Sequence, residues 1–230
     1  RSAGDDVIVE SFTIPDLNLV DAETFDIDLL DYPGVSQLDV ITDLELENGS
    51  YSSIVLDIID GNINQSYVRD NDGVKALNAS SSQLVLPGIS VSGGVQGFTI
   101  EFSLAQSLQY LSASESYVLT NEGIRVEDSD SGSISGRVET ELFDLDSPCD
   151  TKADPLTGNR IYLYSGINLG RNNLADVFTS SSSESIPDDV IAPFAVADVI
   201  EVRGSTTANY IFGFIPEGEY TLVFSCEAED

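Results

Sequence analysis

The feature that most constrains the fold is a succession of short apolar runs separated by Gly, Asn, Asp and Ser. In residues 24–32, Phe25, Ile27 and Leu29 alternate with aspartates, as expected of a strand with one face buried and one face in water. Runs of this kind recur along the whole chain, whereas helical spacing of leucines is confined to residues 104–114. The sequence therefore predicts an all-β protein with little helix.

The runs fall into two groups, which predicts two domains. An acidic stretch rich in Ser and Gly at residues 128–133 separates them, as expected of an inter-domain joint. We predict two tandem β-sandwich domains of the immunoglobulin-like or prealbumin-like kind, residues 1–130 and 131–230, with a long exposed loop at 176–193. The predicted strands are residues 5–14, 24–32, 51–59, 82–91 and 97–104, a hairpin over 70–77, and then residues 133–142, 159–166, 197–204, 208–215 and 219–226.

One local pattern occurs twice, about 170 residues apart. Tyr51 and Tyr220 each follow a Gly by two positions and each lead into an apolar strand. The pattern indicates the same turn-to-strand entry in both domains. We expect each tyrosine to pack at the edge of its own domain rather than to contact a ligand.

The charge balance excludes several classes of partner. The chain has 40 acidic and 9 basic residues, a formal net charge of −31. Such a surface repels phosphate backbones and anionic lipids, so we expect neither nucleic-acid nor membrane-surface binding. An acid-rich surface is typical of solubility in salty water, with cation binding as the alternative. No apolar run approaches 18 residues, so no membrane-spanning helix is predicted.

The residue types needed for common catalytic sites are missing. Histidine is absent, which removes Ser-His-Asp and Cys-His nucleophilic sites and His-ligated zinc. Among 40 acidic residues some pair always lies at a glycosidase separation, so such a pair carries no signal, and Trp, the usual platform for sugars, is absent. We expect a protein without enzymatic activity or cofactor.

The two cysteines and two pairs of aspartates are the remaining candidate sites. Cys149 and Cys226 lack the spacing of a metal site and predict one structural disulfide, hence an oxidising compartment, outside the cell or at its surface; two buried free thiols are the alternative. Each aspartate pair places carboxylates two residues apart, which suits a calcium ion, but a hairpin turn explains the first pair and a solvated linker the second. These weak calcium candidates are Asp70, Asp72, Asp128 and Asp130.

Residues 7–127 resemble a bacterial surface-protein family, the domain of unknown function 4382, which is often found in lipoproteins. The segments that carry the resemblance are Ile27–Leu30, Leu46–Leu56, Phe98–Leu104 and Ile124–Arg125. Residues 131–226 resemble the carboxypeptidase regulatory-like (prealbumin-like, or Cna B-type) sandwiches, through residues 132–138 and 214–226. Neither resemblance implies a known active site.

The first family usually opens with an additional strand, whereas Arg1–Gly4 leads straight into what resembles its second strand. The chain therefore looks like a processed product whose first sandwich lacks one edge strand. An edge left open in this way can accept a strand from a neighbouring molecule. The predicted donor strand is the N-terminal segment with Val7, Ile8, Val9, Phe12 and Ile14.

These observations favour a non-enzymatic structural protein, a subunit of a bacterial extracellular filament that polymerises with itself by strand donation. The alternative is a cell-surface or periplasmic lipoprotein module that binds a glycan, calcium or a protein ligand. A lipid anchor on a precursor is compatible with both.

Overall fold

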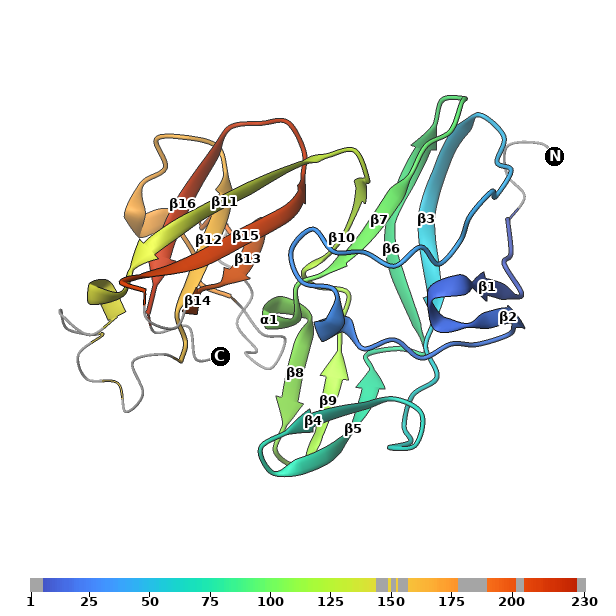
Figure 1. The fold of residues 1–230 in the computed structure, drawn as a ribbon, viewed down its shortest axis with the longest axis horizontal. Helices are drawn as coiled ribbons and strands as arrows, with labels where there is room; N and C mark the ends of the chain where they lie inside the picture. Colours follow the sequence, from blue (N-terminus) through green and yellow to red (C-terminus); the bar gives the residue numbers. More distant parts are fainter. Residues whose placement is uncertain are drawn as a thin grey trace.

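The computed structural model describes residues 6–143, 149, 152, 157–177, 190–201 and 205–226. The fold is all-β with little helix, as the sequence predicts, and its strands form two packed units (Figure 1). The first sandwich, residues 49–128, lies on the right in Figure 1, and the second sandwich, residues 132–226, lies on the left. In the described part of the chain, no helix is long and apolar enough to cross a membrane.

The first sandwich is built from antiparallel pairs and one four-stranded sheet. Strand β3 pairs with β6, β7 pairs with β10, and β4-β5-β9-β8 form a sheet in which β5 and β9 run parallel. A small β1-β2 hairpin precedes it. The elements are β1 (Phe12–Ile14), η1 (Pro15–Leu17), β2 (Leu19–Ala22), η2 (Leu29–Asp31), β3 (Gly49–Asp57), β4 (Tyr67–Asp70), β5 (Gly73–Ala79), β6 (Gln83–Val91), β7 (Phe98–Phe102), α1 (Leu104–Ser107), β8 (Leu108–Leu111), β9 (Ser116–Leu119) and β10 (Ile124–Asp128).

The second sandwich consists of two three-stranded sheets, β11-β15-β14 and β13-β12-β16. Leu163 of β12 and Ala208 and Phe212 of β15 are 0–2% exposed and lie in the core shared by the two sheets. The elements are β11 (Gly132–Glu139), η3 (Thr140–Phe143), β12 (Arg160–Ser165), η5 (Arg171–Asn173), β13 (Ala195–Asp198), β14 (Ile200–Glu201), β15 (Thr207–Ile215) and β16 (Tyr220–Ser225).

Strand β12 is buried on both faces. Ile161 and Leu163 point into the core between the sheets, whereas Tyr162 and Tyr164 lie in a separate cluster with Val177 on the other face. The Tyr164 hydroxyl donates to the carbonyl oxygen of Ala175 at 2.6 Å, and burial raises the pKa of this phenol to about 12. The segment after β12 is thereby held against the outer face of its sheet.

The repeated Gly-x-Tyr pattern forms the same structure in both sandwiches. The Tyr51 hydroxyl donates to the carbonyl oxygen of Glu47 at 3.1 Å, and the Tyr220 hydroxyl donates to that of Pro216 at 2.9 Å. In both cases the acceptor lies four residues upstream, before the turn that enters the strand. Both tyrosines therefore close their own turns.

Two predicted strands are wrong in extent or in kind. Residue 5 lies outside the described residues, and of residues 6–14 only Phe12–Ile14 form a strand, β1. Residues 24–32 form no strand; they contain η2, where the Asp28 carboxylate accepts from the backbone N–H of Leu30 at 3.0 Å. Phe25 instead packs edge-on against Phe12, with ring centroids 5.0 Å apart. The sequence does alternate, but none of the described strands pairs with this segment.

Smaller differences concern ends and loops. The leucines of residues 104–114 form one helical turn, α1, and then continue as strand β8. In the run at 197–204, residues 197–201 are divided between β13 and β14, and residues 202–204 lie outside the described residues. Most of the predicted exposed loop, residues 178–189, lies outside the described residues, but Val177 is buried.

We predict that Tyr51→Phe and Tyr220→Phe each lower the free energy of unfolding by about 1 kcal/mol, because each removes one hydrogen bond and leaves the ring in place. The control is Tyr67→Phe, since Tyr67 is 50% exposed. Urea denaturation followed by circular dichroism measures all three. Equal stability of the three variants and the parent would contradict a structural role for the repeated pattern.

Candidate functional site

Strand β3 has an open edge. It has nine residues and pairs with β6 on one side. In the described part of the chain, no strand pairs with its other side. Residues 49–56 contain no charged residue and no proline, the usual devices that prevent edge strands from adding another chain. The edge therefore offers unprotected backbone donors and acceptors.

The edge strand β11 of the second sandwich differs from β3. Its register with β15 shifts between Gly132 and Ile134, and it carries Arg137 and Glu139. Irregular register and charge both discourage pairing with a further strand. Strand β11 thus has the protection that β3 lacks.

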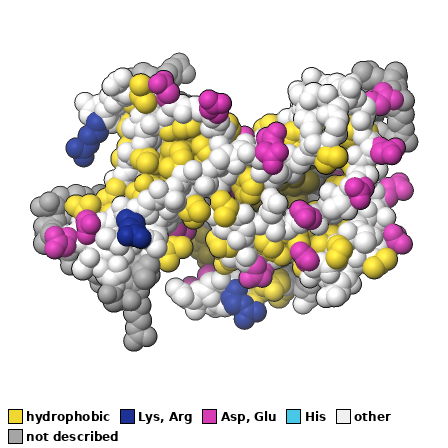
Figure 2. All heavy atoms as spheres, turned by 45° about the horizontal axis from the view of Figure 1, so that its top comes forward, with side chains coloured by type: hydrophobic (Ala, Val, Ile, Leu, Met, Phe, Trp, Pro, Cys, Tyr) yellow, Lys and Arg dark blue, Asp and Glu magenta, His cyan; other side chains and the backbone are white. Residues whose placement is uncertain are grey.

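The apolar core of the first sandwich is also less well covered than that of the second. Among the described residues, its cluster has four buried hydrophobic side chains and eight partly buried ones, whereas the corresponding cluster of the second sandwich has ten and five. Figure 2 shows hydrophobic side chains inside a hollow in the right-hand half of the molecule, where the first sandwich lies. The partly buried members are Ile54, Leu56, Ile58, Leu77, Ala79, Ile100, Phe102 and Val126.

Strand β3 is apolar on both faces where its edge is open. Ile54 and Leu56 face the partly covered core, while Val55 faces outward and is 47% exposed. Val55 lies directly opposite Val85 of β6, which is 54% exposed. A strand added at this edge would find apolar neighbours above and below.

The predicted donor segment is divided by the structure. Phe12 and Ile14 belong to β1, which pairs with β2, and Ile14 is fully buried. Val7 and Val9 are half-buried, and Ile8 is 75% exposed. Within the described residues, no strand pairs with residues 6–11, here called the N-terminal arm. The first three predicted donor residues are thus in the arm, and the last two are committed to the chain's own hairpin.

Arg125 of β10 forms the junction between the two sandwiches. Its guanidinium pairs with Glu101 of β7 and, at 3.1 Å, with Glu127. It also lies 4.5 Å from the ring centroid of Phe194, which precedes β13 in the second sandwich. The pKa of Arg125 is lowered, mainly because the guanidinium is buried, and the neighbouring Glu127 opposes that shift.

Backbone groups complete this junction. Arg125 donates to the carbonyl oxygens of Gly213 and Phe214 in β15 at 3.5 and 3.4 Å. Phe214 has a φ of 49°, in the left-handed region. A Cβ on Gly213 would lie 2.1 Å from the carbonyl oxygen of Gly34, so only glycine allows the 34–35 segment this close to β15.

A shallow hollow of about 310 Å³ lies beside the junction. Serine hydroxyls and Gln37 line it, together with Val35 and Phe214. Thr99 and Ser129 hydrogen-bond to each other nearby, with their hydroxyl oxygens 2.8 Å apart. The hollow is small and polar, and it contains no acid–base pair.

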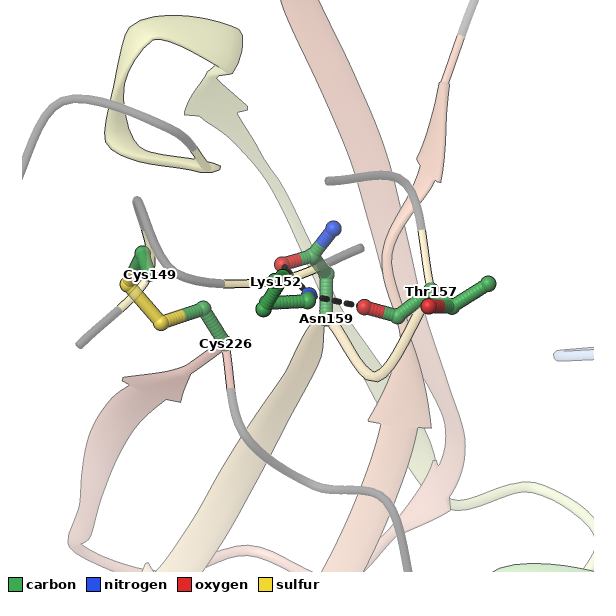
Figure 3. The surroundings of a disulfide bond; sticks show 5 residues. All are labelled: Cys149, Lys152, Thr157, Asn159 and Cys226. Carbon is green, nitrogen blue, oxygen red and sulfur yellow. Dashed lines mark hydrogen bonds between the residues drawn. A yellow bond between two sulfur atoms is a disulfide. The ribbon is translucent and has the colours of Figure 1, made fainter. Parts of the chain in front are cut away.

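The predicted disulfide is present. Cys149 and Cys226 are bonded, with their Cα atoms 5.7 Å apart, and Cys226 is buried at the end of β16 (Figure 3). Lys152 donates to the carbonyl oxygen of Thr157 and, at 3.3 Å, to Oδ1 of Asn159 (Figure 3). The bond therefore ties the segment that leads into β12 to the end of the neighbouring strand, β16.

The four aspartates proposed for calcium lie in two turns, in each of which the first aspartate accepts from the backbone N–H of the second. Asp70 Oδ1 accepts from the backbone N–H of Asp72 at 2.9 Å in the β4-β5 hairpin, and its Oδ2 accepts from the Tyr117 hydroxyl at 3.1 Å. Asp128 Oδ1 accepts from the N–H of Asp130 at 2.8 Å. Among the described residues, no three Asp, Glu, His or Cys side chains gather as metal ligands. The carboxylates visible in Figure 2 are scattered singly.

Sequence reasoning did not identify the junction. In the sequence, Arg125 stands out only as part of Ile124–Arg125, one of the segments that carry the family resemblance, and Phe194 does not stand out. One signal was present: Arg125 and Glu127 alternate on one face of a strand in a chain with 9 basic residues. The partners Phe194 and Gly213 come from segments more than 60 residues away, which no local pattern connects.

The fold and these sites define a disulfide-bonded, all-β protein with two packed sandwiches, one with an open edge. Residues 7–121 match the family described as Domain of unknown function (DUF4382), and the chain belongs to this family. This confirms the resemblance of the first half. No curated protein and no solved structure matches the chain.

We predict that loss of the disulfide lowers the free energy of unfolding of the second sandwich by about 4 kcal/mol, because the bond restricts the unfolded chain over a sequence separation of 77 residues. The double variant Cys149→Ser/Cys226→Ser tests this by denaturant unfolding. Reductant should weaken the parent to the same extent and leave the variant unchanged. A parent protein that reductant does not affect would contradict the prediction.

We predict that Arg125→Met destabilises the protein by about 3 kcal/mol, because two partly buried glutamates lose their counter-charge. The matched control is Arg160→Met, whose partner Asp198 has a side chain that is 76% exposed; it should cost under about 1 kcal/mol. Thermal and urea unfolding of both variants decide the matter. Equal effects of the two substitutions would remove Arg125 from its role at the junction.

Proposed function

We propose that this protein is a non-enzymatic structural subunit that polymerises with itself by strand donation into a filament outside the cell or at its surface. The observation that carries the proposal is the combination, in the first sandwich, of an open and unprotected β3 edge with a partly covered apolar core. A donated strand would satisfy both, since it adds backbone hydrogen bonds and covers apolar side chains.

The geometry of such an assembly is head-to-tail. The acceptor edge and the apolar arm are different surfaces of one chain, so a contact between two copies leaves one free acceptor and one free donor. Heterologous contacts of this kind continue into open helical filaments when the rotation does not close a ring. Copies of this one protein are therefore sufficient to build a fibre.

The charge of the chain is compatible with this type of contact and unfavourable for broad ones. Two copies, each with a formal net charge of −31, repel when large surfaces approach. Residues 49–56 of the edge and Val7–Val9 of the arm are uncharged. A narrow, apolar, strand-to-strand contact keeps most acidic side chains in solvent.

The second sandwich supports the proposal as a spacer. Its core is well covered, its edge strand β11 is irregular and charged, and the disulfide closes it. We propose that it is a carboxypeptidase regulatory-like (Cna B-type) sandwich, which the position of β11 as first strand and β16 as last strand supports. Disulfide-bonded sandwiches of this sort suit an oxidising environment.

We predict that the purified protein forms elongated polymers on concentration and that Ile8→Asp weakens their assembly, because the substitution removes an apolar contact of the donated strand and adds negative charge between two chains that each have a formal net charge of −31. The matched control is Val20→Asp in β2, since Val20 is 76% exposed and Ile8 is 75% exposed. Both variants should fold, which circular dichroism checks. Negative-stain microscopy and light scattering measure assembly. A parent protein that stays monomeric at all concentrations sinks the proposal.

A further inference from the structure

We infer that the N-terminal arm of one copy pairs with the open edge of β3 in a second copy, with the Val7–Val9 triplet beside the Ile54–Leu56 triplet. This inference rests on the proposed function and assigns the two surfaces that meet.

The sequence of the arm indicates a strand that is covered on both faces. Strands with one wet face alternate apolar and polar residues, whereas strands covered on both faces have continuous apolar runs. Val7, Ile8 and Val9 are such a run. In the single chain, Val7 and Val9 are half-buried but Ile8 is 75% exposed, so one face of the run is uncovered.

The β3 edge offers the matching environment. Ile54, Val55 and Leu56 are also a continuous run, with Ile54 and Leu56 toward the partly covered core and Val55 toward solvent. An arm paired alongside would place Val7 and Val9 over the core and Ile8 beside Val55, because neighbouring residues of adjacent strands share a face. One contact would therefore cover the core with Val7 and Val9 and give Ile8 an apolar neighbour in Val55.

In the single chain, no strand of the described residues pairs with the arm, and the hairpin that follows it is fixed, so the arm is the segment that can pair with a second copy. Phe12 is fixed by its pairing with β2 and its contact with Phe25, and Ile14 is fully buried. Only the arm is available for exchange, and six extended residues reach about 20 Å. A donor with its own anchored hairpin leaves its body outside the acceptor, as a linear assembly requires.

Cysteine cross-linking between separately tagged copies tests the pairing. If Ile8 lies opposite Val55, antiparallel pairing places Glu10 opposite Ser53, and parallel pairing places it opposite Asp57; all three are exposed in the single chain. Protein with Glu10→Cys is mixed with protein carrying Ser53→Cys or Asp57→Cys and oxidised under conditions that leave the native disulfide intact. The matched control acceptor is Ser135→Cys on the β11 edge, which is also exposed.

We expect a heterodimer with one of the two β3 acceptors, at least tenfold more abundant than with the Ser135→Cys acceptor. Equal cross-linking to all acceptors, or none to β3, overturns the inference; if the parent still forms filaments, the proposed function stands. Placing both cysteines in one chain adds a further check, because a monomeric cross-linked product at high dilution means that the arm lies on its own edge and also overturns it. A specific heterodimer without filaments supports the pairing and contradicts the proposed filament.

Discussion

The structure depends on the requirement that every sheet bury an apolar face. The second sandwich meets this requirement: two three-stranded sheets enclose Leu163, Ala208 and Phe212, and a further layer covers the tyrosines of β12. The first sandwich meets it in part, since most of its apolar cluster is only partly buried, and its strand β3 also has a free edge without charge over residues 49–56. The difference between the two units is the central physical fact about this protein, because uncovered apolar surface and unpaired backbone groups favour association.

The junction around Arg125 connects the partly covered first sandwich to the well-covered second sandwich. Arg125 holds two glutamates of its own sandwich, the ring of Phe194 and two carbonyl groups of β15. Gln106 adds a hydrogen bond to the carbonyl oxygen of Pro193 at 3.3 Å. Several directional contacts from one side chain fix an orientation better than an apolar surface of similar size. In the proposed filament, this connection would keep a fixed orientation between the second sandwich and the strand-donation contacts of the same copy.

Much of the strand order was accessible from the sequence, for identifiable reasons. The hairpin at Asp70–Gly73, the strands β3, β6, β7, β12 and β16, and the shared role of Tyr51 and Tyr220 follow from alternation and turn residues, which act over a few positions. The failures are equally local in origin. Residues 24–32 have the pattern of a strand, but a strand also needs a hydrogen-bonded neighbouring strand. In this segment Phe25 instead packs its ring against that of Phe12. Asp70 and Asp128, two of the candidate calcium residues, accept hydrogen bonds from backbone N–H groups two residues further on, as carboxylates in turns commonly do.

The sequence by itself determined the fold class, the strand-forming segments, the cysteine pair and the acidic surface, because these depend on residue type and short-range order. It also contained the continuous apolar runs at residues 7–9 and 54–56, without saying that either lacked a neighbour. Only the tertiary structure decided that β3 is an edge, that Ile8 is exposed while Ile14 is buried, and that Arg125 meets Phe194 and Gly213. These facts depend on which distant segments pair and which do not, and that choice is made by the packing of the whole chain rather than by any stretch of it.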